Sequence, residues 1–282
     1  MSEPSATAAS SAAPSAAPSA APPAAPPAVT VEIGTDHVAL VTINRPEARN
    51  AVNGAVAAGL EAAIDQTEAN PDIWAVIITG TGTQAFCAGA DLKEISAGRG
   101  AGLRTERGGF AGFVNAPRTK PWIAAVNGPA LAGGCEIVLT CELVVAAEGA
   151  VFGLPEVKRG LMAVAGGLYR LPRVLPRPLA LECILTGEPI TAEHAHQFGM
   201  VNRLVPAARV VAEARALAAR ITANAPLAVR GSLAVAKQSL DLTDAELKEL
   251  SLQAMVPVAA SEDYQEGPRA FIEKRAPRWT GR

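Results

Sequence analysis

Two glycine-bearing segments have the residue types and spacing to stabilise a negative charge on a carbonyl oxygen. They are Phe86–Glu94 and Asn127–Glu136, and each follows an apolar run that predicts a buried strand, Ala75–Thr79 and Trp122–Val126 respectively. Small residues that open a helix leave backbone N–H groups unpaired. Two such turns facing one another would offer two donors to one developing oxyanion. The first hypothesis is therefore an enzyme that transforms an acyl group.

Two glutamates stand where they could transfer protons near such a site. Glu136 follows Gly133 and Gly134, and residues three apart share a helix face, so its carboxylate is expected near the Gly133 N–H. Glu156 ends the segment Phe152–Glu156. Each feature alone is more often packing or a solvated side chain. Together, two carboxyls beside one oxyanion site suit proton removal and delivery around a carbonyl.

Other chemistries have weaker signals. The chain has three histidines and no Ser-His-Asp ordering, which argues against a serine hydrolase. It has no phosphate-binding loop and no dinucleotide fingerprint. His194 and His196 diverge on a helix because they are two apart, and with Glu193 they predict a helix start. Asp91 is expected to cap a helix rather than to perform chemistry.

Composition excludes several kinds of partner. The formal net charge of −2 provides no positive field for nucleic acid or an anionic membrane surface. No run approaches the roughly 20 apolar residues that span a bilayer, and the N-terminus lacks the features of a signal peptide. The four cysteines lack metal-ligand spacing, so we expect no metal site and a reduced, cytoplasmic protein.

The chain divides into three parts by composition. Residues 1–28 are almost wholly Ala, Pro and Ser, which predicts a disordered extension. Residues 29–205 alternate apolar strand-like runs with helical patterns, which indicates an α/β core with parallel pairing. Residues 206–282 are mostly helical in pattern.

Several elements follow from local patterns. A strand is expected over Val38–Ile43, followed by a helix with Val52, Val56, Leu60 and Ile64 on one face, capped by Asn50 and closed at Asn70. A short helix is expected from Leu92, a glycine-rich flap over Gly98–Gly112, a helix over Ile137–Glu142 and a strand over Leu143–Ala146. C-terminal helices are expected over Val210–Ala223, Leu227–Leu240 and Asp241–Ala260, and a charged tail over Ser261–Arg282.

The chemical segments resemble the signatures of the crotonase (enoyl-CoA hydratase/isomerase) superfamily. The resemblance rests on Phe86–Glu94, Asn127–Glu136, Phe152–Glu156 and the opening Ile43–Ala51, and it extends over residues 29 to 282. It implies a spiral of repeated ββα units followed by a helical C-terminal region used in trimerisation. It also implies a homotrimer or a dimer of trimers.

The resemblance also assigns roles to residues. It implies an oxyanion hole formed by the N–H groups of Ala90 and Gly133, which would hold a thioester enolate. Glu136 and Glu156 match the two catalytic glutamates of the hydratases, which add water to a 2,3-enoyl-CoA or remove it. Coenzyme A is then part of the substrate, and no cofactor is implied. The implied CoA contacts are Glu47, Ala48, Arg49 and Ala88, with Phe271 and Lys274 of the same or a neighbouring subunit at the nucleotide end.

Within the superfamily, the pattern is most similar to carnitinyl-CoA dehydratases. The similarity lies in Gly108–Gly112 and in the C-terminal Ser261–Asp263, Glu266–Pro268 and Glu273–Arg275. A trimethylammonium substrate would call for an aromatic cage, and with 4 % aromatic residues no cage is evident. The chain also departs from the family, because Val164 adds bulk where many hydratases have glycine, and this is expected to reshape the water site or the acyl pocket.

Three hypotheses follow. The leading one is a lyase that hydrates or dehydrates acyl-CoA thioesters with both glutamates. The second keeps the fold but isomerises a double bond with one glutamate. The third is a non-catalytic acyl-CoA-binding homologue, against which the retention of both Glu136 and Glu156 argues.

Overall fold

A six-stranded sheet carries the apolar runs of the chain. Its strands, in spatial order, are β1 (Val29–Ile33), β2 (Val38–Ile43), β3 (Ala75–Gly80), β6 (Trp122–Val126), β8 (Leu143–Ala147) and β11 (Arg203–Val205). β1 pairs antiparallel with β2, and the other four pairings are parallel. Every residue of β3 and β6 is buried, as expected for parallel strands covered on both faces.

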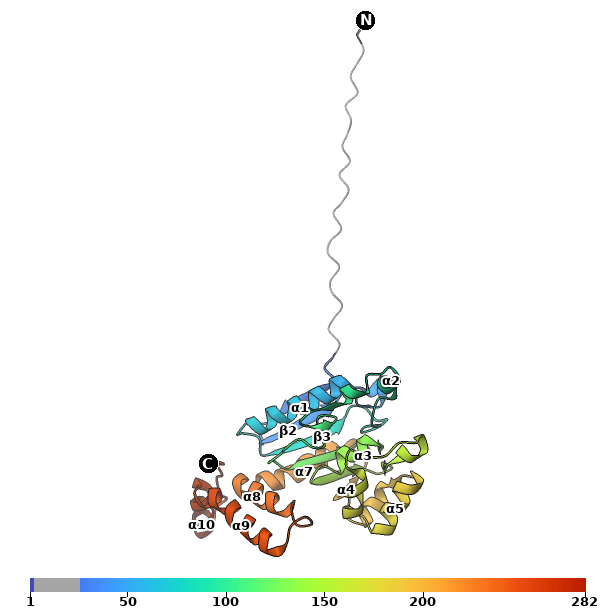
Figure 1. Ribbon diagram of the computed structural model, residues 1–282. Coiled ribbons are helices and arrows are strands. Elements are labelled where there is room, and N and C mark those ends of the chain that lie inside the picture. The colour runs from blue at the N-terminus through green and yellow to red at the C-terminus, as the bar shows by residue number, and fades with distance from the viewer. Residues whose placement is uncertain (3–25) are drawn as a thin grey trace.

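The structure is a computed structural model that describes residues 1–2 and 26–282 (Figure 1). The extension predicted over residues 1–28 therefore lies almost wholly outside the described residues.

A second, smaller sheet gives the chain its repeating course. It has the order β10 (Ile190–Thr191), β9 (Val151–Gly153), β7 (Ala130–Leu131). The chain runs from β6 through β7 into helix α3 (Gly133–Val138), then from β8 through β9 into a 3-10 helix, Pro155–Arg159, followed by α4 (Gly167–Val174). Each unit places one strand in each sheet before a helix. This is the ββα repeat predicted for the core.

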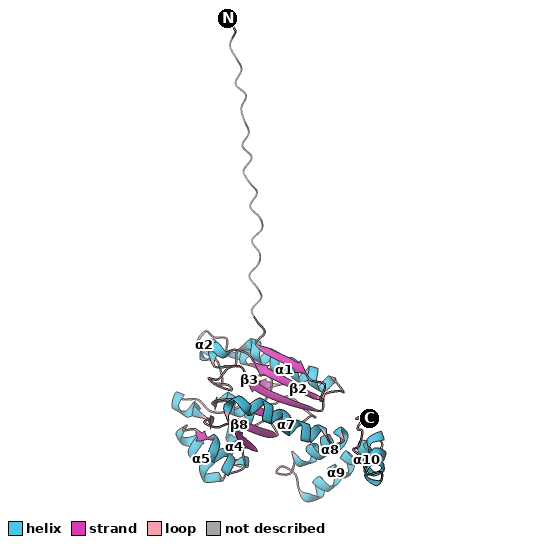
Figure 2. Ribbon diagram, turned by 180° about the vertical axis from the view of Figure 1, so that it is seen from behind, coloured by secondary structure: helices cyan, strands magenta, loops and turns pink. Residues whose placement is uncertain are grey.

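Helices cover the large sheet and extend beyond it. α1 (Gly54–Ala69) packs on β1 and β2, while α7 (Val210–Thr222) contacts β2, β3, β6, β8 and β11. α8 (Pro226–Ala236), α9 (Asp244–Ala259) and α10 (Glu262–Ile272) form a helical region to one side of the α/β core (Figures 1 and 2). The remaining short elements are α2 (Leu92–Ser96), α5 (Arg177–Thr186), α6 (Ala192–Gln197), the hairpin of β4 (Arg104–Thr105) and β5 (Gly109–Phe110), and 3-10 turns at Pro46–Ala48, Gly100–Leu103 and Ala207–Arg209.

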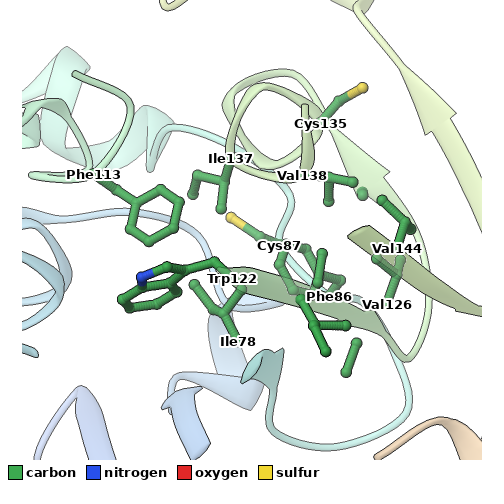
Figure 3. Packing of buried hydrophobic residues seen from close by; sticks show 14 of the residues in the cluster. Ile78, Phe86, Cys87, Phe113, Trp122, Val126, Cys135, Ile137, Val138 and Val144 are labelled. Carbon is green, nitrogen blue, oxygen red and sulfur yellow. The ribbon is translucent and has the colours of Figure 1, made fainter. Parts of the chain in front are cut away.

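The core includes residues of both glycine segments, Phe86 and Cys87 of the first and Cys135 of the second (Figure 3). Phe113 and Trp122 meet edge to face, with ring centroids 5.1 Å apart, and both are fully buried. Cys87 of the first segment and Ile137 of α3 are also fully buried. Dense packing of this kind leaves little freedom to the backbone of the two glycine segments.

No helix in the described part of the chain has the length and apolar character to cross a membrane.

The predicted cap of the first long helix is wrong. Asn53, not Asn50, caps α1, and its side chain accepts a hydrogen bond from Val56 N at 3.0 Å. Asn50 is fully buried with a left-handed backbone (φ 55°), and its amide donates to the carbonyls of Thr81 and Ala85. Both residues are good caps by type, and only the tertiary contacts distinguish them.

Two other element predictions need correction. The helix expected over Ile137–Glu142 begins four residues earlier, because Gly133 and Gly134 belong to its first turn. It ends at Val138. The charged tail expected over Ser261–Arg282 contains α10, for which Ser261 is the N-cap and accepts from Tyr264 N. The helix is supported by Glu266, whose carboxylate pairs with Arg269 and Arg275. These ion pairs stabilise a helix in the segment that the sequence indicated only as charged.

Candidate active site

The two glycine segments lie side by side. Leu131 N donates to Cys87 O at 3.0 Å, and Phe86 N donates to Pro129 O at 3.0 Å. Gly89 has φ +91°, and a Cβ built on it would lie 3.0 Å from the Gly133 nitrogen. Only glycine allows the first segment to approach the second this closely.

The amides of Ala90 and Gly133 have no hydrogen-bond acceptor among the described residues, whereas the amides on either side of Ala90 are occupied. Gly133 is the first residue of α3, so no helical carbonyl reaches its N–H. It follows Ala132, whose positive φ (51°, with ψ −129°) is strained for a residue with a side chain. Strain at this position thus stands next to an amide that has no acceptor among the described residues.

Glu136 is almost completely buried at 3 % exposure. Its Oε1 accepts a hydrogen bond from Gly167 N at 2.9 Å. Burial raises the pKa of this carboxyl to about 7, with a smaller contribution from the like charge of Glu156, and the Gly167 N–H opposes the rise. A carboxyl with a pKa near neutrality can both take and give a proton at physiological pH.

Glu156 stands on the 3-10 helix that follows β9. Burial raises its pKa as well. Its Oε2 is buried and has no hydrogen-bond partner within the described residues. An unsatisfied buried carboxyl oxygen is costly, and such atoms are found where a ligand or water is to be held.

One cavity of about 1300 Å³ brings these groups together. Its lining includes Ala90, Gly133, Glu136 and Glu156, the four residues that the sequence singled out for a common site. Four of the six expected CoA contacts line the same cavity: Glu47, Ala48, Arg49 and Ala88.

Phe271 and Lys274 are not in this lining. Phe271 is 85 % exposed at the end of α10. Their contact with CoA stays a prediction.

The residues that the sequence assigned to helix starts have that place in the structure. Asp91 caps α2, with its side chain accepting from Lys93 N at 3.1 Å. His194 and His196 lie on α6, which Thr191 caps. The described residues contain no cluster of three or more His, Cys, Asp or Glu side chains that could hold a metal ion.

Two contributors to the site were missed. Arg45 donates to Ala51 O at 2.7 Å and pairs with Asp91 at 3.1 Å, which ties the opening segment to the first glycine segment. The Phe110 ring packs against Gly133, where an added Cβ would lie 2.2 Å from its Cε1. The Asn-Arg-Pro sequence was a signal for the first, but nothing local marks the second.

The sequence matches a known family. The model of the family described as enoyl-CoA hydratase/isomerase matches residues 34–282. The chain belongs to the enoyl-CoA hydratase/isomerase family. The predictions of this family and of an enzyme of the hydratase/dehydratase kind are confirmed.

Pairwise comparisons with individual proteins support the same family. The chain is 41 % identical over 253 residues to the mevalonyl-coenzyme A hydratase of Aspergillus fumigatus, covering 88 % of this chain and 93 % of that one. It is 38 % identical over 247 residues to the carnitinyl-CoA dehydratase of Salmonella typhi, covering 86 % and 94 %. The crystal structure of an enoyl-CoA hydratase from Mycobacterium tuberculosis superposes with a TM-score of 0.87 at 46 % identity, covering 91 % and 100 %. The crotonase fold predicted for this family member is thereby confirmed.

Proposed function

We propose that this protein adds water to, or removes it from, the 2,3 bond of an enoyl-CoA thioester. One observation carries the proposal: a single cavity contains two carboxyls with raised pKa values and two backbone amides that have no acceptor among the described residues. The amides suit a thioester oxygen that becomes an enolate oxygen in the transition state. No cofactor is proposed, because CoA arrives with the substrate.

The proposed mechanism divides the proton transfers between the glutamates. In hydration, one carboxylate takes a proton from the attacking water as its oxygen bonds to C3. The electrons of the double bond move onto the thioester oxygen, where the N–H groups of Ala90 and Gly133 stabilise the charge. The other carboxyl, protonated, delivers its proton to C2. Dehydration reverses each step, so both directions require both glutamates.

The acyl end of the cavity is where we propose that substrate choice is made. Leu161, Met162 and Val164 line the cavity with side chains 50–69 % exposed. Val164 thus has room to contact the acyl group or the water. We propose that it narrows this end relative to relatives with glycine.

Carnitinyl-CoA dehydration is a narrower form of the proposal, supported by the similarity to the Salmonella enzyme. Against it, Phe110 is the one aromatic side chain that the described residues contribute to the cavity lining. A trimethylammonium group is best held by several aromatic faces. Comparing turnover of crotonobetainyl-CoA and crotonyl-CoA decides the matter, since no preference for the betaine would refute the carnitine assignment.

The assembly is proposed to be a homotrimer or a dimer of trimers. The support is a set of exposed apolar side chains on the helical region, each 43–85 % exposed: Leu252, Met255, Val256, Phe271 and Ile272. We also propose a cytoplasmic location, which rests on the four free cysteines.

Steady-state hydration of crotonyl-CoA tests the central proposal. We expect Glu136→Gln and Glu156→Gln each to lower kcat by about 100-fold or more. Glu148→Gln, on an exposed turn after β8, is the matched control and should retain full activity. Activity that survives one of the two substitutions would favour the isomerase, and binding of CoA esters by the wild type without any turnover would favour the non-catalytic homologue.

A further inference from the structure

Arg170, on the first turns of α4, connects two segments that are far apart in sequence. Its Nη1 donates to Ala165 O at 3.0 Å, and its Nη2 donates to Val114 O at 3.1 Å. The side chain is half-buried and has no carboxylate partner within 4 Å among the described residues. A guanidinium that donates to two carbonyls and forms no ion pair holds those two carbonyls in a fixed relative position.

The first of these segments holds Glu136. Ala165 is followed by Gly166 and Gly167, and Gly167 N donates to the Glu136 carboxylate at 2.9 Å. A Cβ built on Gly166, whose φ is +117°, would lie 1.9 Å from Arg170 Nη1. The φ of Gly166 calls for glycine, and the absence of a side chain there leaves space in which the guanidinium lies against the loop.

The second segment supports the oxyanion hole. Val114 is in a tight turn with Phe110, to whose carbonyl its N–H donates at 3.3 Å. The Phe110 ring in turn packs directly on Gly133. One guanidinium thus joins the loop that orients Glu136 to the turn that packs against an amide of the oxyanion hole.

We propose that Arg170 is a positioning residue: it sets the Glu136 carboxylate relative to the Gly133 amide by clamping the carbonyls of Ala165 and Val114. The inference rests on the proposed function for its catalytic consequence, but the clamp itself does not. Displacements of about 1 Å in such a constellation can cost about 100-fold in rate.

Arg170 also affects the charge of Glu136. Its positive charge lowers the pKa of that carboxyl, opposing burial and Glu156. Glu156 and Arg170 are the charged groups that act on Glu136 directly. The other charged side chains lining the cavity are Arg45, Glu47, Arg49, Asp91, Lys93, Arg104 and Arg159.

Three variants separate position from charge. Arg170→Met removes both the bridge between the two carbonyls and the positive charge. Without the bridge, kcat for crotonyl-CoA should fall by about 10- to 100-fold. Without the charge, the Glu136 limb of the pH–rate profile should move to higher pH. Arg170→Lys keeps the charge but cannot bridge both carbonyls, so it should lose rate while its profile stays near that of the wild type. Arg173→Met is the control, because Arg173 lies on the same helix but pairs with Asp241 at the surface. It should behave as wild type.

A second readout does not depend on turnover. The Glu136 carboxyl, followed by ¹³C NMR in selectively labelled protein, should titrate at higher pH in Arg170→Met than in wild type and Arg173→Met. An inactive wild type would refute the proposed function but leave this titration as the test of Arg170. The inference is overturned if folded Arg170→Met keeps the wild-type kcat and titration. It is equally overturned if Arg170→Met loses only thermal stability, because Arg170 would then merely hold the fold together.

Discussion

The two glutamates of the cavity differ in how they are held. Glu136 is oriented by the Gly167 N–H, whereas the Oε2 of Glu156 has no partner in the described residues. Both pKa values are raised by burial, and that of Glu136 reaches about 7. Pairs of carboxyls with distinct environments are typical of sites where one acts as acid while the other acts as base.

The pKa of Glu136 predicts a pH-dependent cost to stability. The folded protein holds this proton more tightly than the unfolded chain, in which the pKa is near 4.5, so the stabilisation is complete below pH 4.5 and is lost as pH rises through about 7. Glu136→Gln removes this loss and should gain stability relative to wild type between pH 5 and pH 8, by up to about 3 kcal/mol. Thermal unfolding of wild type and Glu136→Gln at pH 5 and pH 8 measures this gain in stability.

Glu148→Gln is the control for this measurement, because Glu148 is exposed. Its difference from wild type should be the same at pH 5 and pH 8. If Glu136→Gln showed an equally constant difference, the carboxyl of Glu136 would have an ordinary pKa in the folded protein.

At the scale of elements, the start of α3 depends on how closely it packs on the first glycine segment. A Cβ built on Gly134 would lie 2.1 Å from the backbone oxygen of Cys87, and neither backbone can move without disturbing the buried core below. The contact brings the Ala90 and Gly133 amides to one place. The proposed oxyanion hole would thus be a consequence of strand-like pairing between two turns.

Gly134→Ala should therefore destabilise the protein by about 1–3 kcal/mol, from overpacking, and lower kcat at the same time. Gly149→Ala is the matched control, since Gly149 has φ +81° but no atom within 4 Å of an added Cβ. That substitution costs only backbone strain, about 1–2 kcal/mol, and should leave kcat unchanged. Equal kcat in the two variants would refute the close-packing argument.

The end of α1 depends on a buried lysine. Lys120 is 1 % exposed, and its Nζ donates to the carbonyls of Thr67, Glu68 and Asn70, which the helix itself leaves unpaired. Burial lowers the pKa of this amine to about 8.

Lys120→Met should lower the free energy of unfolding by about 1–3 kcal/mol, because the three carbonyls lose the hydrogen bonds that the Lys120 amine donates to them inside the protein. Lys158→Met, at an exposed pair with Glu188, should cost at most about 1 kcal/mol. Urea unfolding of both variants makes the comparison. Similar losses would show that the Lys120 contacts contribute no more than a surface ion pair.

For the whole molecule, the helical region extends away from the α/β core (Figure 2) and exposes apolar side chains. Leu252 and Val256, four residues apart on α9, are 60 % and 67 % exposed. Contiguous exposed apolar surface is typical of a protein interface.

The double substitution Leu252→Asp/Val256→Asp should lower the molar mass in light scattering from that of a trimer or hexamer towards that of one chain. Leu185 is exposed on α5, at the other end of the molecule (Figure 1), and Leu185→Asp should leave the molar mass unchanged. A wild type that is already monomeric would refute the proposed assembly.

Local sequence determined much of this protein. The apolar runs of β2, β3 and β6 predict their strands within a residue, because buried parallel strands need continuous apolar sequence. Gly133 and Glu136 were expected to share a site because three residues of helix hold them together.

Tertiary structure alone decided the rest. Asn50 and Asn53 are equally good caps by type, and buried contacts with residues 81 and 85 take Asn50 away from the helix. Arg170 donates a hydrogen bond to Val114, which is 56 residues away in sequence. The Phe110 ring packs on Gly133, and no pattern in the sequence around Phe110 predicts this contact. Sequence patterns report the preferences of neighbouring residues. A catalytic cavity is formed by contacts between distant segments, and these exist only once the sheet has brought its strands together.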